Sequence, residues 1–139
     1  KNISYYTAVG NKAMVQGGKV SGGEWIDTIR FRDWLKTEIQ SKVLNLFLGL
    51  SKVPFTDQGI ALVQNAVIDA LEEGVRAGGI VQEASSEDGE ATQSYTVTVP
   101  RAADLDAAAR KSRKLTGVTW SAQLAGALIA AKIGGTLNY

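Results

Sequence analysis

Apolar residues recur at helical spacing in the stretch from Glu24 to Leu50. At about 100° per residue they fall on one broad face, which predicts an amphipathic α-helix, the longest of the chain. The residues of this face are Trp25, Ile29, Leu35, Ile39, Val43, Leu46, Phe47 and Leu50. Pro54 ends the helical pattern, because proline lacks the backbone N–H that a helix interior requires.

A second helix is predicted from Thr56 or Asp57 to about Ala77. The side-chain oxygen of either first residue can accept a hydrogen bond from an otherwise unpaired N–H group of the first turn. Apolar residues follow the i, i+3/i+4 rule at Ile60, Val63, Val67, Leu71 and Val75. Gly78 and Gly79 then stop the helix.

A composition rich in β-forming residues predicts a strand at Ile3 to Val9, and alternation of apolar and polar residues predicts strands at Tyr95 to Val99 and Val118 to Leu124. After a tight turn at Ala125 and Gly126 the alternation resumes from Ala127 to Ile133, which predicts that the last two strands form a hairpin. The same pattern continues through residues 134–139, so the end of the chain is predicted as a further strand.

The remaining segments are predicted as connections and one short helix. Gly10 to Gly23 contains five glycines and is interpreted as a flexible loop. Gln82 to Thr92 is interpreted as an exposed, mobile loop, because it contains four acids and no base; the acids are Glu83, Glu87, Asp88 and Glu90. Ala102 to Lys114 is rich in alanine, with aspartates early and bases late, and is predicted as a short helix.

This order of elements predicts an α+β fold, in which one antiparallel sheet is covered on one face by the two main helices. We interpret residues 1–139 as a single domain with two arms. The N-terminal arm is a strand and Gly-rich segment over residues 1–23, and the C-terminal arm is a strand over residues 134–139. Both arms adjoin glycines that can act as hinges.

The amino-acid composition excludes several classes of catalytic and binding site. The chain has no cysteine and no histidine, which excludes disulfides, thiol nucleophiles, histidine-based catalytic pairs and histidine metal sites. Fifteen Lys and Arg against fourteen Asp and Glu leave a net charge of +1, so we expect no nucleic acid partner. The longest uncharged stretch has 17 residues, interrupted by Thr, Ser, Gln and Gly, so we expect no membrane partner.

Catalytic and cofactor motifs are not visible in the sequence. The aspartate pairs Asp27/Asp33 and Asp104/Asp106 each have Arg or Lys nearby, and no activated nucleophile is visible. The Gly-rich segment has neither a Walker pattern nor a GxGxxG pattern ahead of a helix, the two glycine-rich motifs that bind phosphate. The acidic loop lacks the ligand spacing of a calcium-binding EF-hand. We therefore expect no enzyme activity, no cofactor and no metal.

Several spaced segments resemble the C-terminal part of the tail-sheath-like proteins of contractile phage tails and prophages. The resemblance spans nearly the whole chain, and the segments that carry it are Gly23–Arg30, Arg32–Lys36, Val53–Ile60, Tyr95–Pro100, Leu115–Val118, Leu124–Ala127 and Gly134–Leu137. The resemblance implies a virion structural subunit that polymerises into a helical tube around an inner tail tube and shortens on contraction. Its partners would be other copies of itself, the inner tube protein and baseplate components.

By the same resemblance the subunit would be assembled in the host bacterial cytoplasm and located in the virion tail. The chain would be the C-terminal domain of a longer protein, and its start at Lys1 rather than Met agrees with that expectation. The alternative is a small α+β protein-binding or oligomerisation module of another tail or secretion-system component.

Sheath-like domains are said to join by lending terminal strands to a neighbour's sheet, and both arms of this chain suit that role. Trp34 falls opposite the main apolar stripe of the first helix, where it is a candidate for a second contact surface. Arg32 and Asp33 can form contacts between subunits or a local ion pair. Arg110 and Arg113 can contact another protein or lie at a solvated helix end. The candidate interface residues are Ile3, Tyr5, Arg32, Asp33, Trp34, Arg110, Arg113, Thr136, Leu137 and Tyr139.

Overall fold

The computed structural model describes residues 5–9, 12–82, 84–85, 91–92 and 94–126. The chain divides into two compact units. Lys1–Arg30 and Gly126–Tyr139 make up the first, which we call the terminal unit, and Phe31–Ala125 make up the second, which we call the body. The interpretation as one domain with two arms stays a prediction.

The terminal unit contains an antiparallel hairpin of β1 (Tyr5–Val9) and β2 (Lys12–Gln16). The interpretation of the Gly-rich segment as loop throughout was therefore wrong for β2. Only Gly10 and Asn11 separate the strands in sequence, and a two-residue Gly-Asn spacing is a hairpin signal. The glycines on either side masked the apolar, β-forming character of Ala13-Met14-Val15.

Helix α1 (Ile26–Gly49) confirms the first predicted helix. Its predicted apolar face is only partly buried, however. Leu35 is the one residue of α1 that is fully buried, whereas Phe47 and Leu48 are 52% and 74% exposed. The helix therefore carries more apolar surface than the body covers.

Helix α2 (Asp57–Arg76) confirms the second predicted helix. The Thr56 hydroxyl accepts a hydrogen bond from the Gly59 N–H at 3.3 Å, as expected for an N-cap. At the other end, Gly78 has φ +74°, a conformation that glycine adopts without strain. The apolar stripe of α2 is buried as predicted at Ile60, Val63, Val67 and Leu71.

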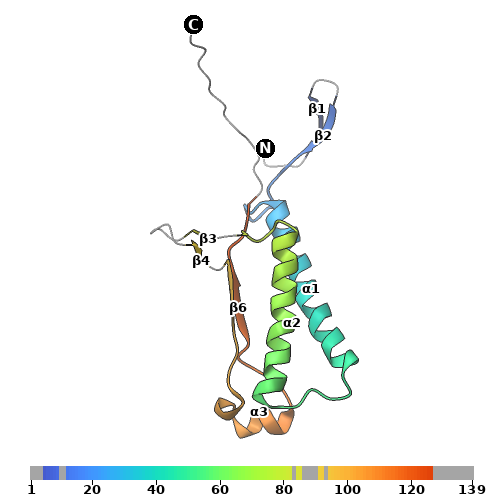
Figure 1. Cartoon of the computed structure of the whole chain (residues 1–139). Coiled ribbons are helices and arrows are strands. Elements are labelled where there is room, and N and C mark those ends of the chain that lie inside the picture. The colour runs from blue at the N-terminus through green and yellow to red at the C-terminus, as the bar shows by residue number, and fades with distance from the viewer. Residues whose placement is uncertain (1–4, 10–11, 83, 86–90, 93, 127–139) are drawn as a thin grey trace. The chain divides into compact units, whose positions relative to one another are not determined.

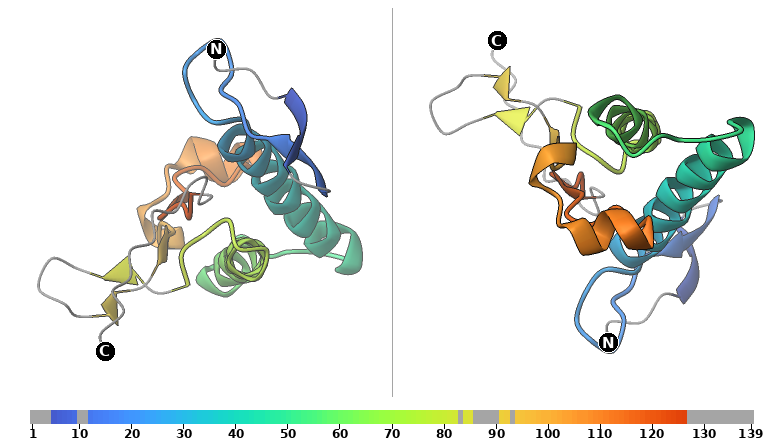
Figure 2. Two further views of the ribbon diagram at one scale, coloured as in Figure 1. Left: turned by 90° about the horizontal axis from the view of Figure 1, so that it is seen from above. Right: turned by 90° about the horizontal axis from the view of Figure 1, so that it is seen from below.

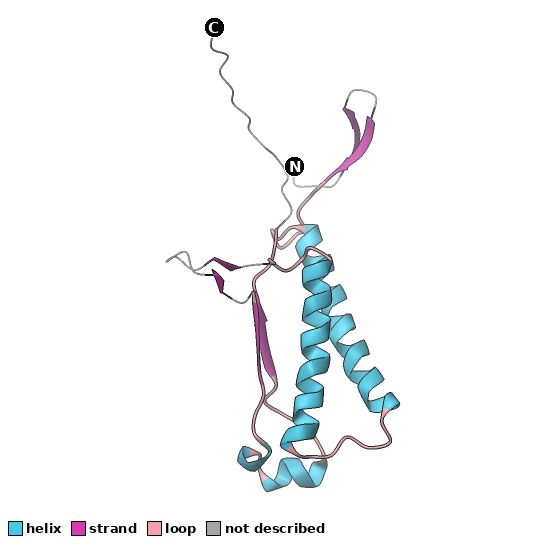
Figure 3. Cartoon of the chain, viewed as in Figure 1, coloured by secondary structure: helices cyan, strands magenta, loops and turns pink. Residues whose placement is uncertain are grey.

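The body's main sheet pairs β5 (Tyr95–Thr98) with β6 (Thr119–Ala122) in antiparallel register (Figures 1 and 3). The α+β class is confirmed, but the described strands form three two-stranded sheets rather than one. β6 pairs with β5, a pairing that the sequence did not predict, whereas the predicted hairpin partner of β6, residues 127–133, lies outside the described residues. Alternation identifies a strand but not its partner.

One hydrophobic cluster joins the two helices to this sheet. Its buried members are Leu35, Val67, Leu71 and Ile80, and partly buried side chains from α1, β5 and β6 pack against it. Helix α2 packs against strand β5. Figure 2 looks along α2 and shows α1 crossing it obliquely, so the helices diverge toward the C-terminal end of α1. This divergence leaves the end of α1 outside the cluster.

The predicted helix over residues 102–114 is in fact two short pieces. A 3₁₀ turn, η1 (Ala102–Asp104), is followed by α3 (Ala107–Ser112). Leu105 and Asp106 between them have non-helical backbone, with ψ of 135° and 146°, so the two pieces are not continuous. Alanine content favoured a helix but did not reveal this break.

A short antiparallel pair, β3 (Ala84–Ser85) and β4 (Ala91–Thr92), lies in the segment that was interpreted as loop. The interpretation was therefore wrong for these four residues. The four acids of this segment lie outside the described residues. Alanine, serine and threonine gave too weak an alternation to predict pairing.

Candidate functional site

The outer edge of β6 is the first candidate for a binding surface. The Gln123 N–H donates to the Ser94 carbonyl at 2.8 Å, which continues the β5–β6 register by one pair. Hydrogen-bonded and non-bonded pairs alternate in an antiparallel ladder. The backbone groups of Thr96 and Ser121 therefore point inward between the strands, and those of Trp120 and Ala122 point outward.

The segment after β6 keeps this orientation. The Val81 N–H donates to the Gln123 carbonyl at 3.0 Å, and the Ala125 N–H donates to the Gly79 carbonyl at 2.9 Å. Both bonds lie on the side of Gln123 that faces Ser94. Within the described residues, nothing pairs with the outward backbone groups of Trp120, Ala122 and Leu124. An unpaired edge of this kind is a template for a further strand.

The opposite edge of the sheet is partly occupied by α2. The Gln64 side-chain amide donates to the Val97 carbonyl at 3.3 Å, and the Tyr95 hydroxyl donates to Glu72 at 3.4 Å. Among the described segments, β5 therefore lies between α2 and β6, and β6 is the outer strand. Trp120 and Leu124 on that strand are 43% and 42% exposed.

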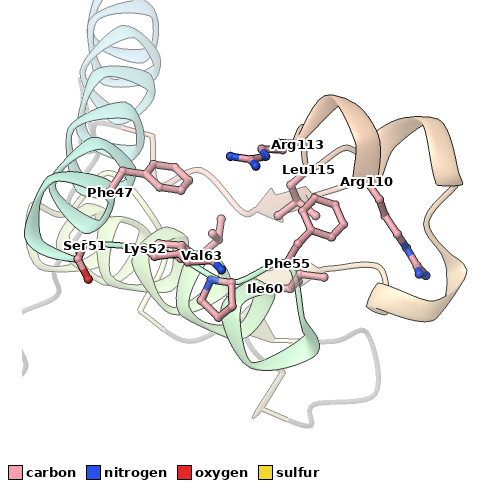
Figure 4. A pocket seen from close by; sticks show the side chains of 12 residues that line it. Phe47, Ser51, Lys52, Phe55, Ile60, Val63, Arg110, Arg113 and Leu115 are labelled. Atoms are coloured by element: carbon pink, nitrogen blue, oxygen red, sulfur yellow. The ribbon is translucent and has the colours of Figure 1, made fainter.

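The second candidate is a hollow of about 640 Å³ between the C-terminal end of α1, the start of α2 and α3 (Figure 4). We call it the basic hollow. Its apolar lining consists of Phe47, Val53, Pro54, Phe55, Ile60, Val63 and Leu115, and its charged lining residues are Lys52, Arg110 and Arg113. No carboxylate is among its lining residues. Its surface therefore combines apolar contact with positive charge.

The two predicted arginines have different roles here. The Arg110 guanidinium donates to the carbonyls of Ala102 and Ala103, the second at 3.2 Å, and so ties α3 to η1. The Arg113 side chain makes no such bond within the described residues, and Figure 4 shows it extending toward Phe47 across the basic hollow. Arg113 is thus available to a partner, whereas Arg110 is engaged.

The predicted cluster on α1 is accessible. Arg32 and Asp33 are exposed, and Trp34 is 37% exposed with its ring 5.5 Å from that of Phe31. Leu35 beside them is buried, so the prediction that Trp34 faces away from the main stripe is compatible with this arrangement. An interface role for these residues stays a prediction.

The arm residues are mostly outside the described part of the chain. Tyr5 begins β1, where it is paired in register with Gln16. Ile3, Thr136, Leu137 and Tyr139 lie outside the described residues. The structure thus does not test the arms.

Sequence reasoning missed three features of these surfaces. Gln64 was not singled out, because nothing local indicates which strand its amide contacts. Phe47 was assigned to the buried face of α1, although it lines the basic hollow. Lys52 was overlooked, but its position between two helices, next to Val53 and Pro54, could have identified an exposed corner with both charge and apolar character.

Burial raises the pKa of the Tyr95 phenol above its ordinary value of 10.0, and the neighbouring carboxylate of Glu72 raises it further by its charge and by accepting the phenolic hydrogen bond. Asp69 adds a smaller effect of the same sign. Tyr95 therefore stays protonated at neutral pH and serves as a link between β5 and α2.

Among the described residues, no group of three or more acidic side chains gathers as a metal site would require. No helix within the same ranges has the length and apolar character needed to cross a bilayer.

A family model described as E217 tail sheath protein gp31-like, C-terminal domain, matches residues 26–137. The match begins at the first residue of α1 and includes the whole body, with both the β6 edge and the basic hollow. No curated protein is significantly similar to the chain.

Proposed function

The chain belongs to the family of E217 gp31-like tail sheath C-terminal domains, and from this premise we propose that it polymerises into a helical tube around the inner tail tube. The family is one of phage tail sheath proteins, which makes this a tail sheath-like structural domain of a virion. We propose that copies join by strand exchange and rearrange during contraction. Baseplate components are proposed as further partners, and the host bacterial cytoplasm as the place of assembly.

The observation that carries this proposal is the unpaired outer edge of β6. Three residues there, Trp120, Ala122 and Leu124, present backbone donors and acceptors that no described segment uses. A neighbour's strand can add to this edge, because backbone hydrogen bonds supply affinity and alternate side chains supply register. The predicted C-terminal arm, residues 134–139, has the length and alternation to fill it.

Such a contact suits a filament. The donor arm and the acceptor edge are different surfaces of the same chain, so one copy can receive an arm and lend its own. A contact of this heterologous kind continues without closing unless the rotation between copies forms a ring. We propose a structural role without enzyme activity, since assembly by backbone pairing requires no chemical step.

A second candidate function rests on the basic hollow. A cavity of about 640 Å³ with apolar and cationic lining could hold a partner segment without any polymerisation. The chain would then be a protein-binding module of another tail or secretion-system component. Sedimentation of the purified protein over a range of concentrations separates the two, because only a sheath subunit forms large polymers.

Proline substitutions test strand addition at the β6 edge. Ala122→Pro and Leu124→Pro each remove an outward N–H, so we expect the monomer to stay folded while polymers are lost. Ser121→Pro is the matched control, because its N–H points inward and its loss should lower the stability of the monomer itself. Leu137→Pro tests the proposed donor arm in the same way.

The readouts are thermal unfolding of the monomer by circular dichroism and polymer formation by electron microscopy. Normal tubes from both Ala122→Pro and Leu124→Pro would exclude the β6 edge as the acceptor. Normal tubes from Leu137→Pro would exclude the C-terminal arm as the donor and leave residues 3–9 as the remaining candidate. A wild-type protein that stays monomeric at all concentrations would contradict self-assembly altogether.

A further inference from the structure

Two of the three cations that line the basic hollow have no partner in the body among the described residues. Within the described part of the chain, Lys52 and Arg113 form no ion pair, and Arg110 is engaged with η1. Covering this hollow with a neutral surface would strip water from both free cations without compensation. A partner that covers it must therefore bring carboxylates.

The backbone at Arg113 supports a role for this side chain. Arg113 has φ +55° and ψ 32°, the left-handed conformation that closes α3, and it is the one non-glycine residue with positive φ among those described. This conformation is unfavourable for a residue that carries a side chain, whereas glycine would adopt it freely. Strain of this kind persists where the side chain has a use.

The chain itself contains a complementary segment. Residues 82–92 hold four acids and no base, and the acids lie next to or between the paired strands β3 and β4. β4 precedes the start of β5, whereas η1 and α3 follow its end. β3 and β4, which adjoin the acids in sequence, thus lie at the opposite end of β5 from α3 and the basic hollow (Figure 1).

We propose that the basic hollow is a docking site for the acidic segment, residues 83–90, of a second copy of this chain. Because β3 and β4 lie at the opposite end of β5 from the hollow, we expect the contact to form between two copies, head-to-tail. This inference rests on the proposed function, and it adds a second contact to strand exchange at β6. Being ionic, the contact weakens with salt and can be exchanged when copies slide.

Charge exchange tests the docking. Lys52→Glu with Arg113→Glu should weaken self-association at least about tenfold and flatten its salt dependence. Adding Glu87→Lys and Asp88→Lys to the same chain swaps both surfaces and should restore association. Lys111→Glu is the matched control, because Lys111 lies on α3 but does not line the hollow.

Arg113→Gly separates a contact role from a structural one. Glycine keeps the left-handed conformation and removes the cation, so we expect an equal or higher melting temperature together with weaker association. Arg113→Lys should keep association, since it keeps the charge. The association constant is measured by sedimentation velocity in a salt series.

Three results would overturn this docking. The first is that Lys111→Glu weakens self-association as much as the Lys52→Glu, Arg113→Glu chain does. The second is that adding Glu87→Lys and Asp88→Lys does not restore association. The third is that Arg113→Gly associates as strongly as the wild type. Polymers that are lost on Ala122→Pro but normal in every hollow variant would reject this docking alone. A wild-type protein that never self-associates would reject both the docking and the proposed function.

Discussion

At the scale of single residues, close packing leaves no room for a side chain at several glycine positions of the body. A Cβ at Gly59 would lie 1.9 Å from the Pro54 carbonyl oxygen, and a Cβ at Gly79 would lie 2.0 Å from the Phe31 ring. The first contact is with rigid backbone, and it holds the loop before α2 against the first turn of that helix. Gly49 at the end of α1, in contrast, has nothing within 4 Å.

Gly59→Ala should therefore lower the free energy of unfolding by about 1–3 kcal/mol, because the added methyl group forces the Pro54 carbonyl to move. Gly49→Ala is the control, with the same chemical change in an exposed helical position. It should leave stability unchanged or raise it by up to about 1 kcal/mol. Urea denaturation of both variants measures the difference, and equal values for the two would contradict the packing argument.

At the scale of elements, α2 organises the body. It begins at a threonine cap, buries a continuous stripe and contacts β5 through side chains. The bonds from Gln64 and Tyr95 fix the register between the helix and the strand at two points 8 positions apart on α2. Within the described part of the chain, this connection orients the sheet so that the outer edge of β6, rather than that of β5, is left unpaired.

The Tyr95 bond predicts a dependence of stability on pH. Since the folded state raises the pKa of Tyr95 above its ordinary value of 10.0, the folded protein holds this proton more tightly than the unfolded chain does. Stability from this group is present below about pH 10 and falls as the pH rises toward the folded pKa.

The free energy of unfolding, measured in urea from pH 9 to 11.5, should fall less steeply in Tyr95→Phe than in the wild type. Glu72→Gln removes the nearby charge and should give an intermediate slope. Identical slopes for wild type and Tyr95→Phe would show that the phenol is not coupled to folding.

At the scale of the whole molecule, buried and exposed apolar surface are unevenly distributed over the body. The core cluster lies where α1, α2 and the sheet meet, and Leu71 at its centre is completely buried. The C-terminal end of α1 projects beyond it, with Leu44, Phe47 and Leu48 more than half exposed. Contiguous exposed apolar residues of this kind are typical of surfaces that bind other proteins.

Substitutions of buried apolar residues should therefore lower the stability of the body more than substitutions of exposed ones. Leu71→Ala should cost about 2–5 kcal/mol, since it removes a buried side chain and leaves a cavity. Leu48→Glu should change the stability of the monomer by no more than about 0.5 kcal/mol, because the side chain is already in water. Thermal unfolding at low protein concentration compares them, and a large loss from Leu48→Glu would mean that the end of α1 packs more tightly than described.

The sequence by itself determined the features that depend on neighbouring residues. The start and end of α2 follow from the Thr56 cap and the glycines at 78 and 79, and Pro54 prevents α1 from continuing into α2; all of these residues act within a few positions along the chain. The buried stripe of α2 and the strand at β5 follow from periodicity. The family was evident as well, because several local segments carry it.

Tertiary structure alone decided which elements meet. Alternation identified β6 as a strand, but its pairing with β5, 21 positions earlier, depends on contacts that no local pattern encodes. The same holds for the exposed end of α1, because a helical stripe does not say how far its partner extends. Arg110 and Arg113 were equivalent in the sequence, and only the fold placed one against η1 and the other over an apolar hollow. Local sequence thus specifies elements, whereas contacts between distant segments specify surfaces, and it is the surfaces that would assemble.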